Sequence, residues 1–389
     1  MAAEEKVPTT AEVLVWARKK ARLSERDAAK KLGIPVADLR LIERGEEPNV
    51  ALFQRMTRVY KRPETVLLLP AAPIEPPEIH DYRRAAGCSG KPLPQTLTAL
   101  RGAATAQQFV SDVLAEEPEI LPRPVLPVTV PPSPEVAAAR ERQRLGVSVV
   151  SQRAWDRDNP TFSAWREALQ AHGILVIQQS MPWNDCRGAA LTGEGMVPTI
   201  LVNSSDSFTG RLFTLFHEYG HLLHRTSGTC IGGPDAESDS AERWCDRFSA
   251  AFLMPADAIN EYLAPIIAKY SPDDWSLTLI QRAAAGFRVS PYAMARRLAD
   301  LEISTYYNNH KQELFLSMQK KGNDSGGGGE FREVEMVREL GTATALVVVE
   351  GLHKGVVSTS ECYAAFGLPA VRVSALESLL QEQRLERRA

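Results

Sequence analysis

The stretch that decides the fold is RLFTLFHEYGHLLHR, residues 211–225, because it joins a helical apolar pattern to the motif His-Glu-x-x-His. The apolar positions recur at helical spacing and are Leu212, Phe216, Tyr219 and Leu223. Helix geometry places His217 and His221 about 6 Å apart along the axis, so both rings can reach one tetrahedral ion. Glu218 lies about 100° further round the helix. From there its carboxylate can act on a water at the metal without being a ligand, so the pattern predicts a Zn²⁺ site with Glu218 as general base.

A catalytic zinc needs a third protein ligand and an open fourth position. A third histidine in the arrangement HExxHxxGxxH is excluded, because residue 224 is His and residue 227 is Ser. A helix over 239–253 supplies Glu242 instead, 21 residues after His221, and we predict Glu242 as the third ligand. Asp246, one turn beyond, is predicted to accept the far N–H of a ligand histidine and to fix its tautomer. Without the upstream motif, Glu242 and Asp246 would be taken for the solvated face of an amphipathic helix.

Two further side chains near the motif have alternative interpretations. His224 could be a metal ligand, but a packing role near a helix end fits its position better. Cys230 and Cys245 are predicted to be ordinary thiols. The five cysteines of the chain are scattered and never form a Cys-x-x-Cys pair, which argues against a disulfide framework and against a thiolate zinc site.

The N-terminal part is predicted to be a small all-α domain, residues 1–65. Its helices are expected at 13–22, 24–32, 36–44 and 50–60, with Ser24 as an N-cap and Gly45 after a helix C-terminus. Residues 11–65 contain 13 Lys/Arg and 8 Asp/Glu, a net charge of +5, whereas the whole chain has −3. A basic surface of this kind favours phosphate binding.

The remainder is predicted to be an α+β domain at 136–320, with a small sheet and many helices. Two strands are expected, 174–178 and 199–203. The second is predicted either as an edge strand that pairs with an extended substrate or as an ordinary strand of the sheet. Prolines make 66–135 a linker and connecting segment, and the glycine-rich stretch 322–330 separates a last helical segment, 331–389, for which packing or dimerisation is expected.

Composition sets the class of protein. With 44% hydrophobic and 24% charged residues in 389, the chain can form two or three cores. It has no apolar run long enough to span a membrane, and Met1–Thr10 lacks the apolar core of a signal peptide. We therefore expect a soluble cytoplasmic protein without a membrane partner.

Residues 211–224, followed by ERWCDRFSAAFLMP at 242–255, resemble the ImmA/IrrE family of bacterial metallopeptidases. The resemblance extends from about residue 80 to 317 and includes Asp81-Tyr82-Arg83, which is similar to a segment between the domains of fused members. It implies a zincin-like, gluzincin-type domain, with zinc bound by His217, His221 and Glu242 and with Glu218 catalytic. Asp246 stands where the family usually has Asn.

Residues 23–35 and 39–45 resemble the XRE-type helix-turn-helix of phage repressors, with 36–44 as the recognition helix. The resemblance implies DNA contacts by Arg26, Asp38, Arg40 and Arg44. Glu25 departs from the type, because Gln is common at that position. Docking to a repressor-like protein is the competing interpretation for this domain.

Taken together, the sequence predicts a zinc endopeptidase fused to a helix-turn-helix domain. As the resemblance implies, its substrate would be a regulatory protein such as a helix-turn-helix repressor, in a bacterial stress or mobile-element response. The alternative is a DNA-binding transcription regulator whose zincin domain senses a ligand or partner without proteolysis. A metal-free scaffold is disfavoured, because every residue of the metal site is present.

Overall fold

The structure is a computed structural model that describes residues 6–21, 23–60, 62–72, 82–84, 92–124, 126, 133–155, 158–183, 185–225, 237–319 and 331–386. It divides into two compact units, Met1–Glu78 and Ile79–Ala389. The stretch 322–330, Asp81, Cys88 and Cys230, about which the sequence makes predictions, lie outside the described residues.

The first unit is a bundle of short helices around its own core. The helices are α1 (Ala11–Lys20), α2 (Glu25–Leu32), α3 (Val36–Ile42), α4 (Val50–Tyr60) and α5 (Glu64–Leu67). The Ser24 hydroxyl accepts the Asp27 N–H at the start of α2, and Gly33, with φ of 69°, makes the turn into α3. Leu14, Leu32 and Met56 are fully buried between the helices. The four predicted helices are confirmed. α1 begins and ends two residues earlier than expected, and α3 ends two residues earlier.

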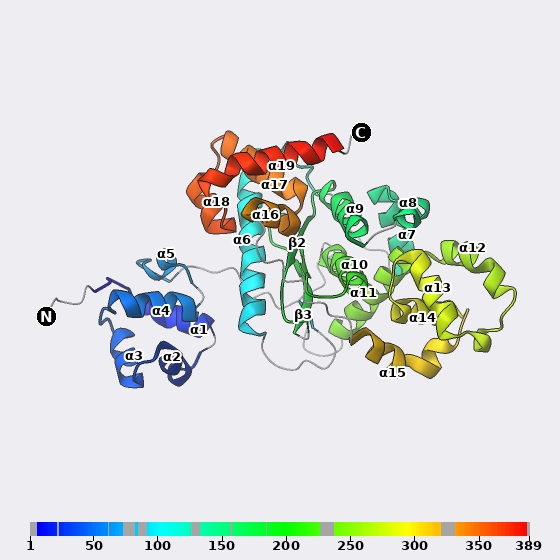
Figure 1. The fold of residues 1–389 in the computed structure, drawn as a ribbon, viewed down its shortest axis with the longest axis horizontal. Helices are drawn as coiled ribbons and strands as arrows, with labels where there is room; N and C mark the ends of the chain where they lie inside the picture. Colours follow the sequence, from blue (N-terminus) through cyan, green and yellow to red (C-terminus); the bar gives the residue numbers. More distant parts are fainter. Residues whose placement is uncertain are drawn as a thin grey trace. The chain divides into compact units, whose positions relative to one another are not determined.

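The second unit is built around a four-stranded sheet of order β1-β3-β4-β2 (Figure 1). The strands are β1 (Tyr82–Arg84), β2 (Leu175–Gln179), β3 (Cys186–Leu191) and β4 (Thr199–Asn203). β2 and β4 are parallel, while β3 is antiparallel to both of its neighbours, β4 and β1. The predicted mixture of helices with a small sheet is confirmed.

Strand β4 is therefore an internal strand. Of the two alternatives predicted for residues 199–203, the ordinary strand of the sheet is confirmed and the substrate-pairing edge is wrong. Its backbone pairs with β2 on one side and with β3 on the other, so it has no free edge. The reason is that β3, a strand of small residues that the sequence pattern did not indicate, is inserted beside it.

Successive side chains of β2 and β4 enter two different cores, because side chains alternate between the faces of a sheet. Val176, Ile200 and Val202 belong to the core that contains α10 (Phe208–Arg225) and α11 (Glu237–Leu253). Ile177 and Leu201 belong to the core on the opposite face. Both faces of the sheet are covered, which explains the continuous apolar runs at 175–177 in β2 and 200–202 in β4.

Further helices complete the first of these cores. They are α7 (Pro134–Leu145), α8 (Val149–Ala154), α9 (Asp158–Gln170), α12 (Ala256–Ile267), α13 (Leu277–Phe287), α14 (Pro291–Asp300) and α15 (Tyr306–Gln319), with a 3₁₀ turn at Pro272–Asp274. No described helix is long and apolar enough to cross a bilayer.

The opposite face of the sheet is covered by α6 (Pro94–Glu116) and by the C-terminal helices (Figure 1). The latter are α16 (Arg332–Leu340), α17 (Thr342–His353), α18 (Thr359–Phe366) and α19 (Val373–Glu386), with a 3₁₀ turn at Ala370–Arg372. The buried Gln170 amide donates to the Leu340 carbonyl at 2.7 Å and joins these helices to α9. Part of the predicted linker and connecting segment at 66–135 is therefore a core helix, α6. Residues 331–386 pack within the second unit.

Candidate metal centre

The predicted motif lies on α10, whose apolar side is fully buried against the sheet and α11. Phe216 stacks on Phe252 of α11 with ring centroids 4.1 Å apart. The two helices approach closely at Gly220, where an added Cβ would lie 3.0 Å from Sγ of Cys245. The glycine between the two motif histidines therefore sets how near α11 comes to them.

Three side chains from these two helices converge. Nε2 of His217 lies 3.1 Å from Oε2 of Glu242, and Nε2 of His221 lies 3.2 Å from Oε1 of the same carboxylate. The two Nε2 atoms are 3.1 Å apart. His217 and His221 are 1% and 6% exposed, while the Glu242 side chain is 46% exposed, so the group opens to solvent on one side.

The donor atoms of this group fit a zinc ion. Two imidazole nitrogens and a carboxylate lie within 4.8 Å of one another, which is the donor set of catalytic zinc with three protein ligands. The exposed side would leave a fourth position accessible. Among the described residues, His217, His221 and Glu242 form the group that could hold a metal, as the sequence predicts.

The electrostatics of the group also suit a cation. Burial works against ionisation of Glu242, yet hydrogen bonds and charge from both histidines hold the pKa of its carboxyl well below the ordinary value. Burial likewise works against a charged His221, but hydrogen bonds to Cys245 and Glu242 raise the pKa of its ring well above the ordinary value. A divalent cation would replace the proton on the Nε2 side of the His221 ring.

The Glu218 side chain is not one of the three that converge as a possible metal-binding group. It is 1% exposed, and its Cγ would lie 3.1 Å from a Cβ added to Gly188 of β3. The same Cβ would lie 2.5 Å from Cγ2 of Thr214, one turn before Glu218 on α10. Glu218 therefore lies beneath β3 and beside the histidines, without belonging to the converging group.

With this geometry established, comparison with known proteins gives one result. Residues 169–299 match the Peptidase_M78 family model, an IrrE N-terminal-like domain. Comparison with curated proteins finds no match. The M78 match includes β2, β3, β4, α10 and α11, and it supports the ImmA/IrrE resemblance and a metallopeptidase. It does not extend to the first unit.

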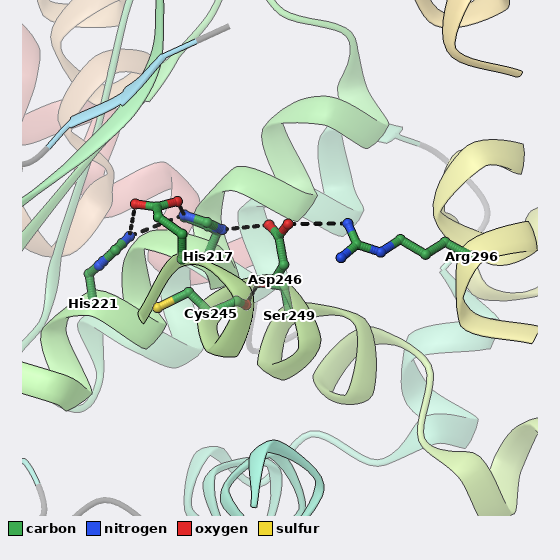
Figure 2. A network of polar contacts seen from close by, with 7 residues as sticks. His217, His221, Cys245, Asp246, Ser249 and Arg296 are labelled. Carbon is green, nitrogen blue, oxygen red and sulfur yellow. Dashed lines mark hydrogen bonds and ion pairs between the residues drawn. The ribbon is translucent and has the colours of Figure 1, made fainter. Parts of the chain in front are cut away.

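Behind the motif His-Glu-x-x-His, the structure places Asp246 where the sequence predicts it. Its Oδ1 lies 3.0 Å from Nδ1 of His217, and its Oδ2 lies 3.2 Å from Nη1 of Arg296 on α14 (Figure 2). Sequence reasoning missed Arg296, because it lies 50 residues after Asp246 and no local pattern links the two. Asp246 and Arg296 also line a cavity of about 90 Å³ together with Arg187 and Asp206.

The structure bears on two side chains near the motif, His224 and Cys245, for which the sequence left alternative roles. The His224 ring packs edge-on against Trp244, with centroids 4.2 Å apart, which confirms its packing role. Burial and the charge of His221 lower the pKa of His224. Cys245 is buried and free, as expected, but its thiol also forms a hydrogen bond with His221.

The predicted DNA contacts lie on the first unit, away from the M78 region in sequence. Arg26, Asp38, Arg40 and Arg44 are all exposed. Nε of Arg40 lies 2.7 Å from Oε2 of Glu25. Glu25, the residue that departs from the helix-turn-helix type, is thus paired with one of the predicted DNA-contacting residues. A phosphate or base would have to compete with this carboxylate for Arg40.

Proposed function

We propose that the chain is a zinc-dependent endopeptidase. The observation that carries the proposal is the convergence of His217, His221 and Glu242 with Glu218 buried beside them. The M78 match over residues 169–299 supports the same reaction class.

In this proposal His217, His221 and Glu242 hold the zinc. When bound, zinc lowers the pKa of water and polarises the scissile carbonyl. Glu218 takes a proton from water as the water oxygen bonds to the scissile carbonyl carbon. Glu218 then gives this proton to the amine nitrogen as the C–N bond breaks, which yields two peptides. Asp246 keeps the His217 ring in the tautomer whose Nε2 is free to bind metal, and Arg296 holds Asp246 in place.

We further propose a regulatory protein as substrate, and a helix-turn-helix repressor in a stress or mobile-element response in particular. This part rests on the resemblance to ImmA/IrrE peptidases. The fused first unit supports it, because a helical unit with net positive charge can bring the peptidase to a DNA-bound protein or to the repressor itself. DNA contacts through Arg26, Asp38, Arg40 and Arg44 belong to this proposal.

The test compares wild type with Glu218→Gln, using Glu261→Gln on the exposed side of α12 as the matched control. Zinc content is measured by mass spectrometry, and cleavage is measured on purified helix-turn-helix repressors from the same genome. We expect Glu218→Gln to keep zinc and to lose cleavage by about 10²- to 10⁴-fold, the usual contribution of a general base.

Glu261→Gln should behave as wild type in both assays. A wild type that binds zinc but whose effect on gene expression is the same as that of Glu218→Gln would favour the alternative, a regulator that senses without proteolysis. A wild type that stays empty after zinc addition would overturn the peptidase.

A further inference from the structure

The outer edge of β3 is the feature that the proposed reaction leaves unexplained. On its inner side β3 pairs with β4, and on its outer side it pairs with β1. Tyr82 is opposite Ala189 and Arg83 is opposite Gly188, after which the register shifts and Arg84 is opposite Cys186. The short pale blue strand at the upper left of Figure 2 is β1.

This edge runs directly beside the proposed general base. Gly188 approaches α10 so closely that an added Cβ would lie 2.5 Å from Thr214 and 3.1 Å from Glu218. A backbone paired to β3 at Gly188 is therefore level with Glu218. In the register of the structure, the residue in that position is Arg83.

An extended peptide on this edge would present its backbone to the site. Peptides commonly bind by adding a strand to a sheet, with main-chain hydrogen bonds supplying affinity. The opposite edge, β2, packs against α9 and α16. Because β4 pairs on both sides with other strands of the sheet, the side of β3 that pairs with the edge strand β1 is the pairing side that lies beside Glu218.

We infer that an extended substrate peptide pairs with the side of β3 that faces β1. Residues 82–84 occupy this side in the structure, so the substrate must displace them. This inference rests on the proposed function, because it names how that site receives its substrate. The backbone groups of β3 that pair with β1 cannot pair with a second strand at the same time. β1 thus acts as an internal competitor for an extended peptide.

Two features of β1 limit its pairing with β3. It has three residues, and its pairing is interrupted by the register shift between Arg83 and Arg84. Such irregularities end pairing and are common beside active sites.

The first experiment tests where β1 lies. The full-length variant Tyr82→Cys/Ala189→Cys joins two residues that face each other across the strands, and Cα separations of about 4.5 to 5.5 Å in such pairs suit a disulfide. Arg83→Cys/Ala189→Cys is the matched control, because neighbouring residues of a strand lie on opposite faces. Under mild oxidation we expect a bridge between residues 82 and 189 in the first variant and none in the control, as mapped by peptide mass spectrometry.

The second experiment tests competition without relying on hydrolysis. In zinc-loaded Glu218→Gln protein, Tyr82→Pro/Arg83→Pro removes at least one inter-strand donor, because successive N–H groups alternate in direction. Tyr82→Ala/Arg83→Ala keeps the backbone donors and is the control. The probe is a fluorescent synthetic peptide with the sequence of residues 79–87, followed by anisotropy.

We expect the proline variant to bind the peptide at least about tenfold more tightly than the unaltered Glu218→Gln protein, since the internal strand no longer competes at high effective concentration. The alanine variant should bind more weakly than the proline variant. Equal affinity in all three proteins, or a bridge in the control pair at the same yield, would overturn the inference. The peptidase proposal fails separately, through absence of zinc or of cleavage in wild type.

Discussion

The carboxylate of Asp246 lies 3.0 Å from Nδ1 of His217, on the side of the ring opposite to Glu242. The ring is therefore held at both nitrogens by residues of one helix, one turn apart on α11. A metal ligand fixed in this way keeps its tautomer and its direction before the ion arrives.

Replacing Asp246 should therefore weaken zinc binding without removing a ligand. We expect Asp246→Ala to lower zinc affinity by about 10- to 100-fold, and Asp246→Asn to lower it less, because the amide oxygen still accepts the ring N–H. Competition with a chromogenic chelator measures the affinity. Asp257→Ala, at an exposed position of α12, is the control and should leave the affinity unchanged. An Asp246→Ala protein with wild-type affinity would show that the contact does not orient the ring.

Arg296 should influence zinc only through Asp246, since its guanidinium is 3.2 Å from that carboxylate and it is not among the converging donors. Arg296→Met should lower zinc affinity less than Asp246→Ala. In a double-mutant cycle its effect should largely vanish once Asp246 is Ala. Additive losses in the double variant would instead mean that Arg296 acts on the metal site by another route.

Zinc binding should strengthen as pH rises from 6 to 8. In the metal-free protein the pKa of His221 is raised and the pKa of Glu242 is lowered, so their ion pair stabilises the fold above the ordinary pKa of Glu and below that of His. That contribution is lost as pH rises through the raised pKa of His221, while zinc needs the unprotonated ring. Thermal melting should show a zinc-induced rise in Tm that is larger at pH 8 than at pH 6. A constant rise would contradict the proton competition.

Gly220 should be coupled to Cys245. An added Cβ at residue 220 meets Sγ, Cβ and Cα of Cys245 at 3.0, 3.3 and 3.4 Å. Overpacking costs about 1 to 3 kcal/mol, whereas Gly to Ala within a helix gains up to about 1 kcal/mol. Gly220→Ala should therefore lower the free energy of unfolding in wild type and cost less in a Cys245→Ala background. Chemical denaturation of the four proteins measures the difference, and equal costs in both backgrounds would show that the helices separate freely.

The two ends of the chain should respond differently to truncation. A protein of residues 79–389 keeps every element of the second unit and should bind zinc as the full chain does. A protein of residues 1–330 loses the helices that bury Ile177, Leu201 and their neighbours, so its second unit should lose its cooperative unfolding transition and its zinc, while the first unit keeps its own core. Circular dichroism melting and zinc content test both. Zinc binding by the 1–330 protein would show that α16–α19 are dispensable.

The sequence was sufficient for the parts of the site that are local in the chain. His217, Glu218 and His221 share one helix, and the apolar period of the next helix places Glu242 and Asp246 on one face. The parts that it did not predict depend on contacts far along the chain. Arg296 reaches Asp246 from α14, and Gln170 reaches the carbonyl of Leu340.

Strand order was equally beyond local patterns. Residues 199–203 have the composition of a strand, but whether a strand lies at an edge is decided by its neighbours. β3 contains Gly188, Ala189 and Ala190. These small residues give a weak strand signal, although Gly188 is required for the close approach to α10. The same close packing that positions the strand beside Glu218 thus makes it hard to recognise.

The placement of α16–α19 on the face of the sheet opposite to α10 has a consequence for how the protein is made. A ribosome synthesises the proposed metal ligands of α10 and α11 well before it reaches residue 332, so this face of the sheet emerges covered by α6 alone. A domain of this kind cannot finish folding during the synthesis of its own metal site. We therefore expect nascent and prematurely terminated chains to bind zinc poorly.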